Sequence, residues 1–149
     1  YFLDDQSSPQ ESHYVWAYLV NIKNLSACTM KLNHRNWVII DANGKIINVQ
    51  GEGVVGEFPI LQPGESFEYT SGTPLKTTNG IMQGFYIMSQ NNGEQIKIDI
   101  PTFSLDSPYN KKNLHLSYSQ INFHDWTIVL AYEEKNSLNH EIICSANNY

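Results

Sequence analysis

Three glycines in the segment GEGVVGE, residues 51–57, have the type and spacing of residues that bind phosphate groups. Gly51, Gly53 and Gly56 form the pattern G-x-G-x-x-G, which is typical of loops that hold the pyrophosphate of a dinucleotide. In such a site a strand enters the loop and a helix leaves it, so that N–H groups at the start of the helix point at the phosphate. The pattern is common by chance, and the flanking residues therefore decide its meaning.

The residues that follow these glycines do not favour a dinucleotide site. Residues 45–50 (KIINVQ) predict the strand, but Pro59 and the turn pair Pro63-Gly64 disfavour a helix after the loop. We therefore predict a bent crossover without a helix, in which Val54 and Val55 close one end of the fold.

The charges beside the glycines leave one alternative open. Glu52 and Glu57 would repel a phosphate unless a cation lay between them. The alternative function is therefore a small-ligand binder that holds pyrophosphate or a nucleotide on backbone N–H groups of the GEGVVGE loop, with Mg²⁺ bridging to either glutamate.

No other group of residues indicates catalysis or a metal site. A G-x-S-x-G motif is absent, and Ser71 reads as a turn residue. The five histidines lack H-E-x-x-H or any paired spacing, and the four clustered glutamates read as solvated rim charges: His13, His34, His115, His124 and His140; Glu52, Glu57, Glu65 and Glu68. We therefore predict that the protein is not an enzyme, with no catalytic residues, no metal ligands and no cofactor.

The net charge and the cysteine content exclude several classes of protein. A formal charge of −6, with Arg35 as the one arginine in the sequence, gives no basic surface for nucleic acid. No apolar run is long enough to span a bilayer, so we expect no membrane partner. Cys28 and Cys144 are far apart and form neither a disulfide framework nor a metal-binding pair, which favours a cytoplasmic location.

Short β-rich runs separated by turn residues dominate the first two thirds of the chain. Residues 14–22 predict a central strand covered on both faces, and residues 28–36 alternate Met30, Leu32 and His34 against Lys31, Asn33 and Arg35. Asn43-Gly44 predicts a tight hairpin between residues 37–41 and 45–50, and a second hairpin joins residues 84–90 to 94–100. With residues 65–71, these runs predict an all-β fold: an antiparallel β-sandwich of about seven strands.

The chain divides into a sandwich domain, residues 1–106, and an extension, residues 107–149. The segment SPYNKKN marks the boundary, because it is rich in polar and turn residues. Within the extension, residues 126–132 (WTIVLAY) are compatible with one more strand, whereas the neighbouring asparagine-rich segments show no alternating face.

Four segments together resemble the bacterial ApaG family over residues 1–105. They are RNWVIIDANGK, VQGEGVVGEFPILQPGESFEYTSGTPL, GIMQGFYIM and IPTFSL, in this order. The resemblance implies an immunoglobulin or fibronectin type III-like sandwich whose first strand is truncated here. It also implies a link to cobalt and magnesium resistance or efflux, and related domains in larger proteins look like protein-interaction modules. The family supplies no catalytic residues, and Asn36 replaces the histidine that the family usually carries between Arg35 and Trp37.

The sequence thus predicts a non-enzymatic module that binds a protein partner, and it leaves a homo-oligomer open. Arg35 and Trp37 are the expected contact residues, where they meet the glycine loop, because an arginine beside aromatic surface is a common interface anchor.

Overall fold

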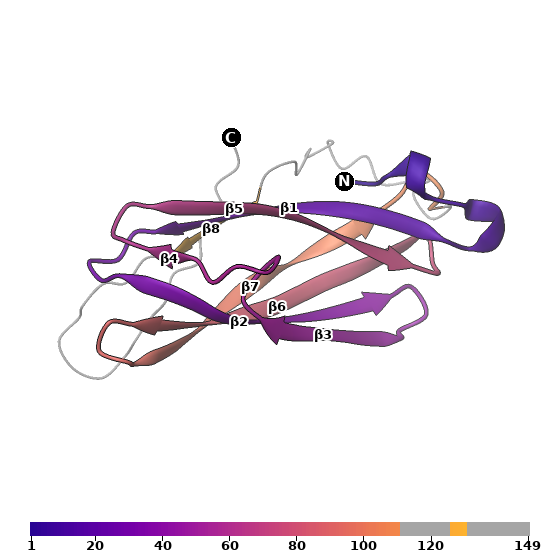
Figure 1. The fold of residues 1–149 in the computed structure, drawn as a ribbon. Helices are drawn as coiled ribbons and strands as arrows, with labels where there is room; N and C mark the ends of the chain where they lie inside the picture. Colours follow the sequence, from indigo (N-terminus) through magenta and orange to yellow (C-terminus); the bar gives the residue numbers. More distant parts are fainter. Residues whose placement is uncertain (111–125, 131–149) are drawn as a thin grey trace.

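The protein is a sandwich of two β-sheets (Figure 1). A computed structural model describes residues 1–110 and the backbone of residues 126–130. Within these residues no helix has the length and apolarity needed to cross a membrane. One sheet has the strand order β5-β1-β8 and the other has the order β3-β2-β6-β7, with β4 also paired to β2. The strands are β1 (Tyr14–Asn24), β2 (Met30–Asp41), β3 (Ile46–Glu52), β4 (Ile60–Leu61), β5 (Ser66–Leu75), β6 (Asn79–Gln90), β7 (Gln95–Asp106) and β8 (Trp126–Leu130); two 3₁₀ turns, Asp4–Gln6 and Pro9–Glu11, precede them.

The predicted β-sandwich is confirmed. Strands β1 to β7 lie within residues 1–106, and both predicted hairpins form. Gly44 donates its N–H to the carbonyl of Asp41 at 3.0 Å, and Gly93 donates to the carbonyl of Gln90 at 2.9 Å. The glycines in these two turns therefore form the tight hairpins that the sequence predicts.

One strand departs from the antiparallel pattern. β8 pairs in parallel with β1, and β1 is therefore the central strand of its sheet, as predicted. Residues 107–125 separate β8 from β7, so no tight hairpin forces an antiparallel direction on it. The division of the chain at residue 106 stays a prediction.

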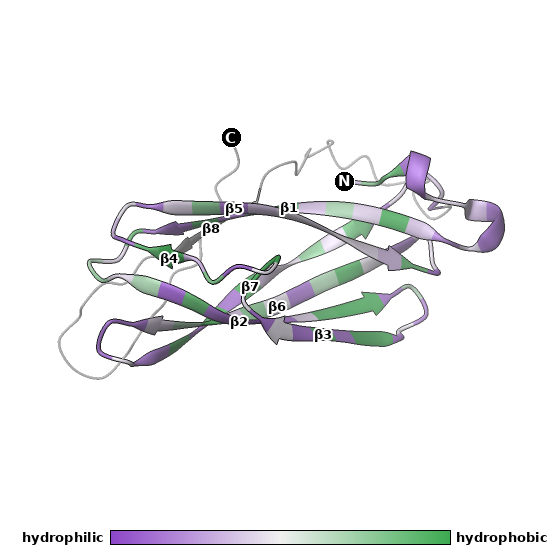
Figure 2. Cartoon of the chain, viewed as in Figure 1, coloured by the Kyte–Doolittle hydropathy of each residue, from purple (hydrophilic) through white to green (hydrophobic). Residues whose placement is uncertain are grey.

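Large side chains from both sheets fill the space between them. Trp16 and Ile22 from β1 face Leu32 and Trp37 from β2 and Tyr86 from β6, and each of these side chains is at most 1% exposed. Figure 2 shows the matching alternation of hydrophobic and hydrophilic residues along the strands. This packing fixes which face of β2 points inward.

A β-bulge at Asn33 corrects the predicted alternation of residues 28–36. The β2–β6 register shifts between Leu32 and His34, so that one residue is unpaired in β2. Before the bulge Leu32 is buried; after it, Trp37 is buried and His34 is exposed. Arg35 consequently points to the inner side of the sheet. The two runs predicted as separate segments are one bent strand.

Asn24 joins the end of β1 to β4. Its side chain is fully buried, and its Nδ2 donates to the carbonyls of Cys28 at 2.8 Å and Leu61 at 2.9 Å. Its Oδ1 accepts hydrogen bonds from the N–H and the hydroxyl of Ser26. Every polar atom of this buried amide is therefore satisfied, which fixes the place where β4 begins the return to the other sheet.

Gly84 allows β2 and β6 to approach closely. A Cβ at this position would lie 2.0 Å from the carbonyl oxygen of Asn36 and 3.1 Å from the ring of Trp37. We predict that Gly84→Ala lowers the free energy of unfolding by about 2–3 kcal/mol, because the two strands must separate around Trp37. The neighbouring Gln83→Ala is the control. Urea unfolding of both variants measures the effect, and equal midpoints would contradict it.

Candidate functional site: the crossover between β3 and β4

Residues 53–59, called the crossover below, connect β3 to β4 through a tight turn. The N–H of Val54 donates to the carbonyl of Glu57 at 2.9 Å, and the N–H of Glu57 donates back to Val54 at 2.8 Å. Val55 and Gly56 between them have φ angles of 45° and 80°. Positive φ at both central residues is the geometry of a type I′ hairpin turn. The chain then continues into β4 and not into a helix, which confirms the predicted crossover.

Gly53 is required for this turn. It has a φ of 58°, and a Cβ there would lie 2.2 Å from the carbonyl oxygen of Glu57. Its N–H donates to the carbonyl of Asn33 at the bulge, at 2.7 Å. The N–H groups of Gly53, Val54 and Glu57 therefore make bonds within the fold, and they do not point toward a phosphate.

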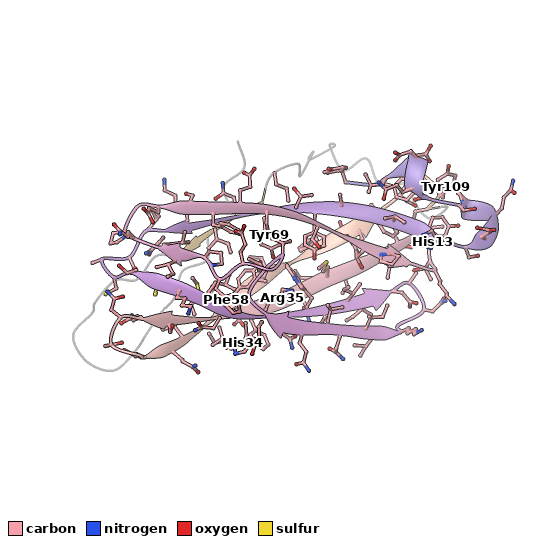
Figure 3. All side chains as sticks on the ribbon, viewed as in Figure 1. His13, His34, Arg35, Phe58, Tyr69 and Tyr109 are labelled. Carbon is pink, nitrogen blue, oxygen red and sulfur yellow. The ribbon has the colours of Figure 1, made fainter. Side chains whose placement is uncertain are left out.

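Arg35 holds the chain where it leaves β3. Its Nη1 donates to the carbonyl of Glu52 at 3.0 Å and to that of Gly53 at 2.8 Å. The guanidinium lies over Gly51, where an added Cβ would be 3.1 Å from Nη1. Figure 3 shows Arg35 between the two sheets and His34 on the outside. The bulge at Asn33 sets both orientations. Arg35 thus meets the glycine loop, but it binds the backbone of that loop.

The structure places Trp37 in the core and not at a surface. It is 1% exposed, and its ring packs edge-on against Tyr18, Tyr86 and Phe103. A partner cannot reach this side chain in the folded protein, so the expectation that Trp37 is a contact residue is wrong. The cause is the bulge, which turns Trp37 toward the opposite sheet.

A cluster of tyrosines lies beside Trp37 and was not found from the sequence. The hydroxyls of Tyr69 and Tyr86 share a hydrogen bond inside the core. Burial raises the pKa of both hydroxyls well above the usual value for tyrosine, and the positive charge of Arg35 offsets this only in part. Burial also raises the pKa of Tyr18, against the opposing effects of Ser71 and Arg35. Alternating aromatic residues predict a core, but not which hydroxyls meet.

The crossover presents apolar side chains to solvent. Val55 is 54% exposed at the tip of the turn, Phe58 is 47% exposed, and Ile60 at the start of β4 is 60% exposed. Lys31 Nζ lies 5.7 Å above the ring of Phe58. Val54, in contrast, is fully buried and closes the end of the sandwich. The prediction is thus correct for Val54 and wrong for Val55, because Val55 lies at the tip of the turn with a positive φ and its side chain projects away from the core.

A shallow depression of about 320 Å³ lies on the outer face of the sheet, next to the crossover. Side chains from β2, β3 and β6 surround it. Those of β2 come after the bulge, and most of them project outward together with the β3 and β6 residues that pair with them. The lining residues are His34, Arg35, Asn36, Gln50, Gly51, Glu52, Phe85 and Ile87.

The predicted residues come together only in part. Gly51, Glu52, Gly53 and Arg35 are in contact, whereas Gly56 and Glu57 lie on the exposed side of the turn. All four clustered glutamates are exposed. Among the described residues no group of three or more histidine, cysteine, aspartate or glutamate side chains could hold a metal ion. Cys28 is a free thiol, and Cys144, His115, His124 and His140 lie outside the described residues.

Comparisons with known proteins agree on one family. The family model described as the ApaG domain matches residues 4–90. Protein ApaG from Paramagnetospirillum magneticum is 54% identical over 115 residues, which are 77% of this chain and 88% of the relative. Protein ApaG from Parvibaculum lavamentivorans is also 54% identical, over 76% of this chain and 88% of its own length. A crystal structure of an ApaA protein from Bordetella pertussis superposes with a TM-score of 0.71 at 40% identity, covering 73% of this chain and 89% of that one.

Removal of the Arg35 hydrogen bonds should loosen the crossover. We predict that Arg35→Met lowers the free energy of unfolding by about 1–2 kcal/mol, since charged donors to carbonyls contribute in this range and the site is partly exposed. Hydrogen exchange at the amides of Gly53 and Val54 should accelerate more than exchange in β6. Lys76→Met is the matched control, because this lysine is exposed in the β5–β6 connection, outside the crossover. Unchanged exchange at both amides would refute this role of Arg35.

The buried tyrosines should make the fold sensitive to alkaline pH. An unfolded tyrosine ionises near pH 10, and the raised pKa values of Tyr69 and Tyr86 keep both neutral in the fold at that pH. Their contribution is therefore complete below about pH 10 and declines above it, by about 1.4 kcal/mol per pH unit for each group. Urea unfolding at a series of pH values measures this decline. The double variant Tyr69→Phe/Tyr86→Phe should show a shallower decline, and an identical one would exclude the assignment.

Proposed function

Because this chain belongs to the ApaG domain family, we propose that it is a non-enzymatic module that binds another protein through the crossover. The observation that carries the proposal is the conformation of Val55. A β-branched residue with positive φ is strained by about 1–3 kcal/mol, and such strain concentrates at functional sites. The strained side chain is also exposed at the tip of the turn.

The surroundings of Val55 favour recognition of a protein surface. Phe58 and Ile60 extend the apolar surface, and Glu57 adds a charge at its rim. An exposed aromatic residue within an apolar patch with a polar rim is the composition found in protein interfaces.

The turn is rigid before a partner arrives. Arg35 bonds the carbonyls at its start, and the fully buried Val54 anchors its first residue in the core. A partner therefore loses little affinity to ordering of this segment, which is the advantage of a preorganised contact.

The small-ligand alternative receives less support from the geometry. Three N–H groups of the glycine loop already bond within the fold, and the guanidinium of Arg35 bonds carbonyls of the same loop. A role in cobalt or magnesium resistance, as the family resemblance implies, would then act through the partner protein.

A photo-crosslinking residue at position 55 tests the proposal. We expect it to capture a protein that the same residue at position 92, in the exposed β6–β7 turn, does not capture. The captured protein, purified, should bind this chain directly. Val55→Asp and Phe58→Ala should each weaken that binding at least about tenfold, the loss typical of a central interface residue. Leu25→Asp, at a residue that is 49% exposed in the β1–β2 connection, should leave it unchanged.

Two results would reject the proposal. One is capture that does not differ between positions 55 and 92. The other is equal binding by the Val55→Asp variant and the wild type. Calorimetry with pyrophosphate or ATP, with and without Mg²⁺, then decides the alternative: heat that Glu52→Gln or Glu57→Gln abolishes would favour a ligand site at the glycine loop.

A further inference from the structure

β3 forms an open edge of its sheet. Among the described residues its one neighbour is β2. Bonds from the N–H of Asp41 to the carbonyl of Lys45 and from the N–H of Gly53 to the carbonyl of Asn33 mark the two ends of the β2–β3 ladder. Because antiparallel ladders alternate, the odd-numbered residues of β3 bond to β2, and the N–H and C=O groups of residues 46, 48 and 50 and the N–H of residue 52 point away from it, whereas the carbonyl of Glu52 accepts a hydrogen bond from Arg35. These groups form a template for another strand.

β3 lacks the features that usually block such an edge. The edge strand β7 carries Pro101 and Lys97 and a register shift against β6, and the edge strand β5 carries Pro74. β3 has no proline, lysine or bulge, and it exposes Ile46 at 58% and Val49 at 41%. An unprotected apolar edge is an aggregation hazard unless a partner uses it.

The depression on the outer face lies against this same edge. Gln50, Gly51 and Glu52 of β3 form its border, and His34 and Phe85 lie across it. A strand added to β3 would direct alternate side chains toward the depression. In recognition by strand addition, main-chain bonds supply affinity and such side-chain sites supply specificity.

The charge beside the depression indicates which side chain fits it. Glu52 is exposed, and no ion pair to its carboxylate occurs among the described residues. The chain as a whole carries a formal charge of −6. His34 lies opposite Glu52 in the β2–β3 ladder, and the Arg35 guanidinium bonds backbone carbonyls. Lys97, farther across the sheet on β7, is already paired with Asp99 at 3.1 Å and lies 4.6 Å over the ring of Phe85. A cationic side chain of a partner could therefore form an ion pair with the carboxylate of Glu52.

We propose that β3 binds an extended segment of a protein partner by strand addition, and that a lysine or arginine of this segment lies in the depression beside Glu52. The inference rests on the proposed function and names the partner's chemistry. The added segment runs between the Asn43-Gly44 turn and the crossover, so it pairs with residues 46–52. Its other face covers Val49 and carries apolar residues. Val55 at the adjoining turn contacts the rest of the partner.

A synthetic peptide tests the proposal with the full chain. The probe is an acetylated and amidated peptide of alternating lysine and valine, about nine residues long, which spans β3 at strand spacing. Titration into the ¹⁵N-labelled protein should shift the outward amides of β3: Ile46, Asn48, Gln50 and Glu52. A peptide with glutamate in place of lysine should bind at least about fivefold more weakly, because it meets Glu52 with a like charge.

Two variants at one position separate backbone pairing from side-chain contact. Asn48→Pro removes an outward N–H without breaking the bonds to β2, and it should weaken peptide binding about tenfold. Asn48→Ala keeps that N–H and should change binding by less than about twofold. Glu52→Gln should weaken binding of the lysine peptide about two- to fivefold, as expected for an exposed ion pair.

A change in the peptide keeps the test valid if Asn48→Pro does not fold. Methylation of alternate backbone nitrogens along one edge should abolish binding to the unaltered protein. Absence of shifts in β3 at about 1 mM peptide, the weak limit of specific binding, would overturn the proposal. Shifts confined to the β5 or β7 edge would also overturn it.

The outcome is distinguishable from failure of the proposed function. A partner that crosslinks to position 55, but binds the Asn48→Pro variant as it binds the wild type, would keep the binding module and reject strand addition. Peptide shifts in β3 without any partner captured at position 55 would reject the crossover as the contact surface and keep the edge.

Discussion

The hydrogen bonds from Arg35 to the carbonyls of Glu52 and Gly53 are the interaction on which the candidate site depends. They exist because the bulge at Asn33 shifts the pleat of β2 by one residue, which brings an arginine to the inner side of the sheet. The same shift places His34 and Asn36 on the outer face, where they line the depression. One unpaired residue therefore organises both faces of the sheet at this end of the molecule.

The strained turn is stable because contacts with several neighbouring segments hold its conformation. Val54 fills the end of the core, Gly53 donates its N–H to the carbonyl of Asn33, and Asn24 holds the end of β4. Each of these contacts would be lost if the turn relaxed, so a cost of about 1–3 kcal/mol at Val55 is sustained. The buried tyrosine pair below it adds directional bonds to a core that otherwise consists of apolar contacts.

Local chemistry made the architecture predictable, whereas the site depended on a feature that no local pattern encodes. Asn-Gly and Asn-Asn-Gly at the two hairpins require positive φ, so their turns followed from the residues alone. Pro59 excluded a helix after the glycines for an equally local reason. The bulge, in contrast, arises from the fit between β2 and β6, and without it the alternation assigned His34 and Arg35 to the wrong faces. The parallel pairing of β8 depends on long-range contacts, and periodicity does not reveal strand direction.

The uneven protection of the sheet edges also determines how far a strand added at β3 could extend the sheet. In the part of the chain that the structure describes, β5 and β7 carry prolines and charges, and β8 covers the other side of β1. A strand added at β3 would extend its sheet on that side only, because the opposite edge of the same sheet, β7, carries Pro101 and Lys97 and offers no comparable template. Strand addition at β3, as proposed, would therefore give a sheet that ends at the partner segment on one side and at β7 on the other.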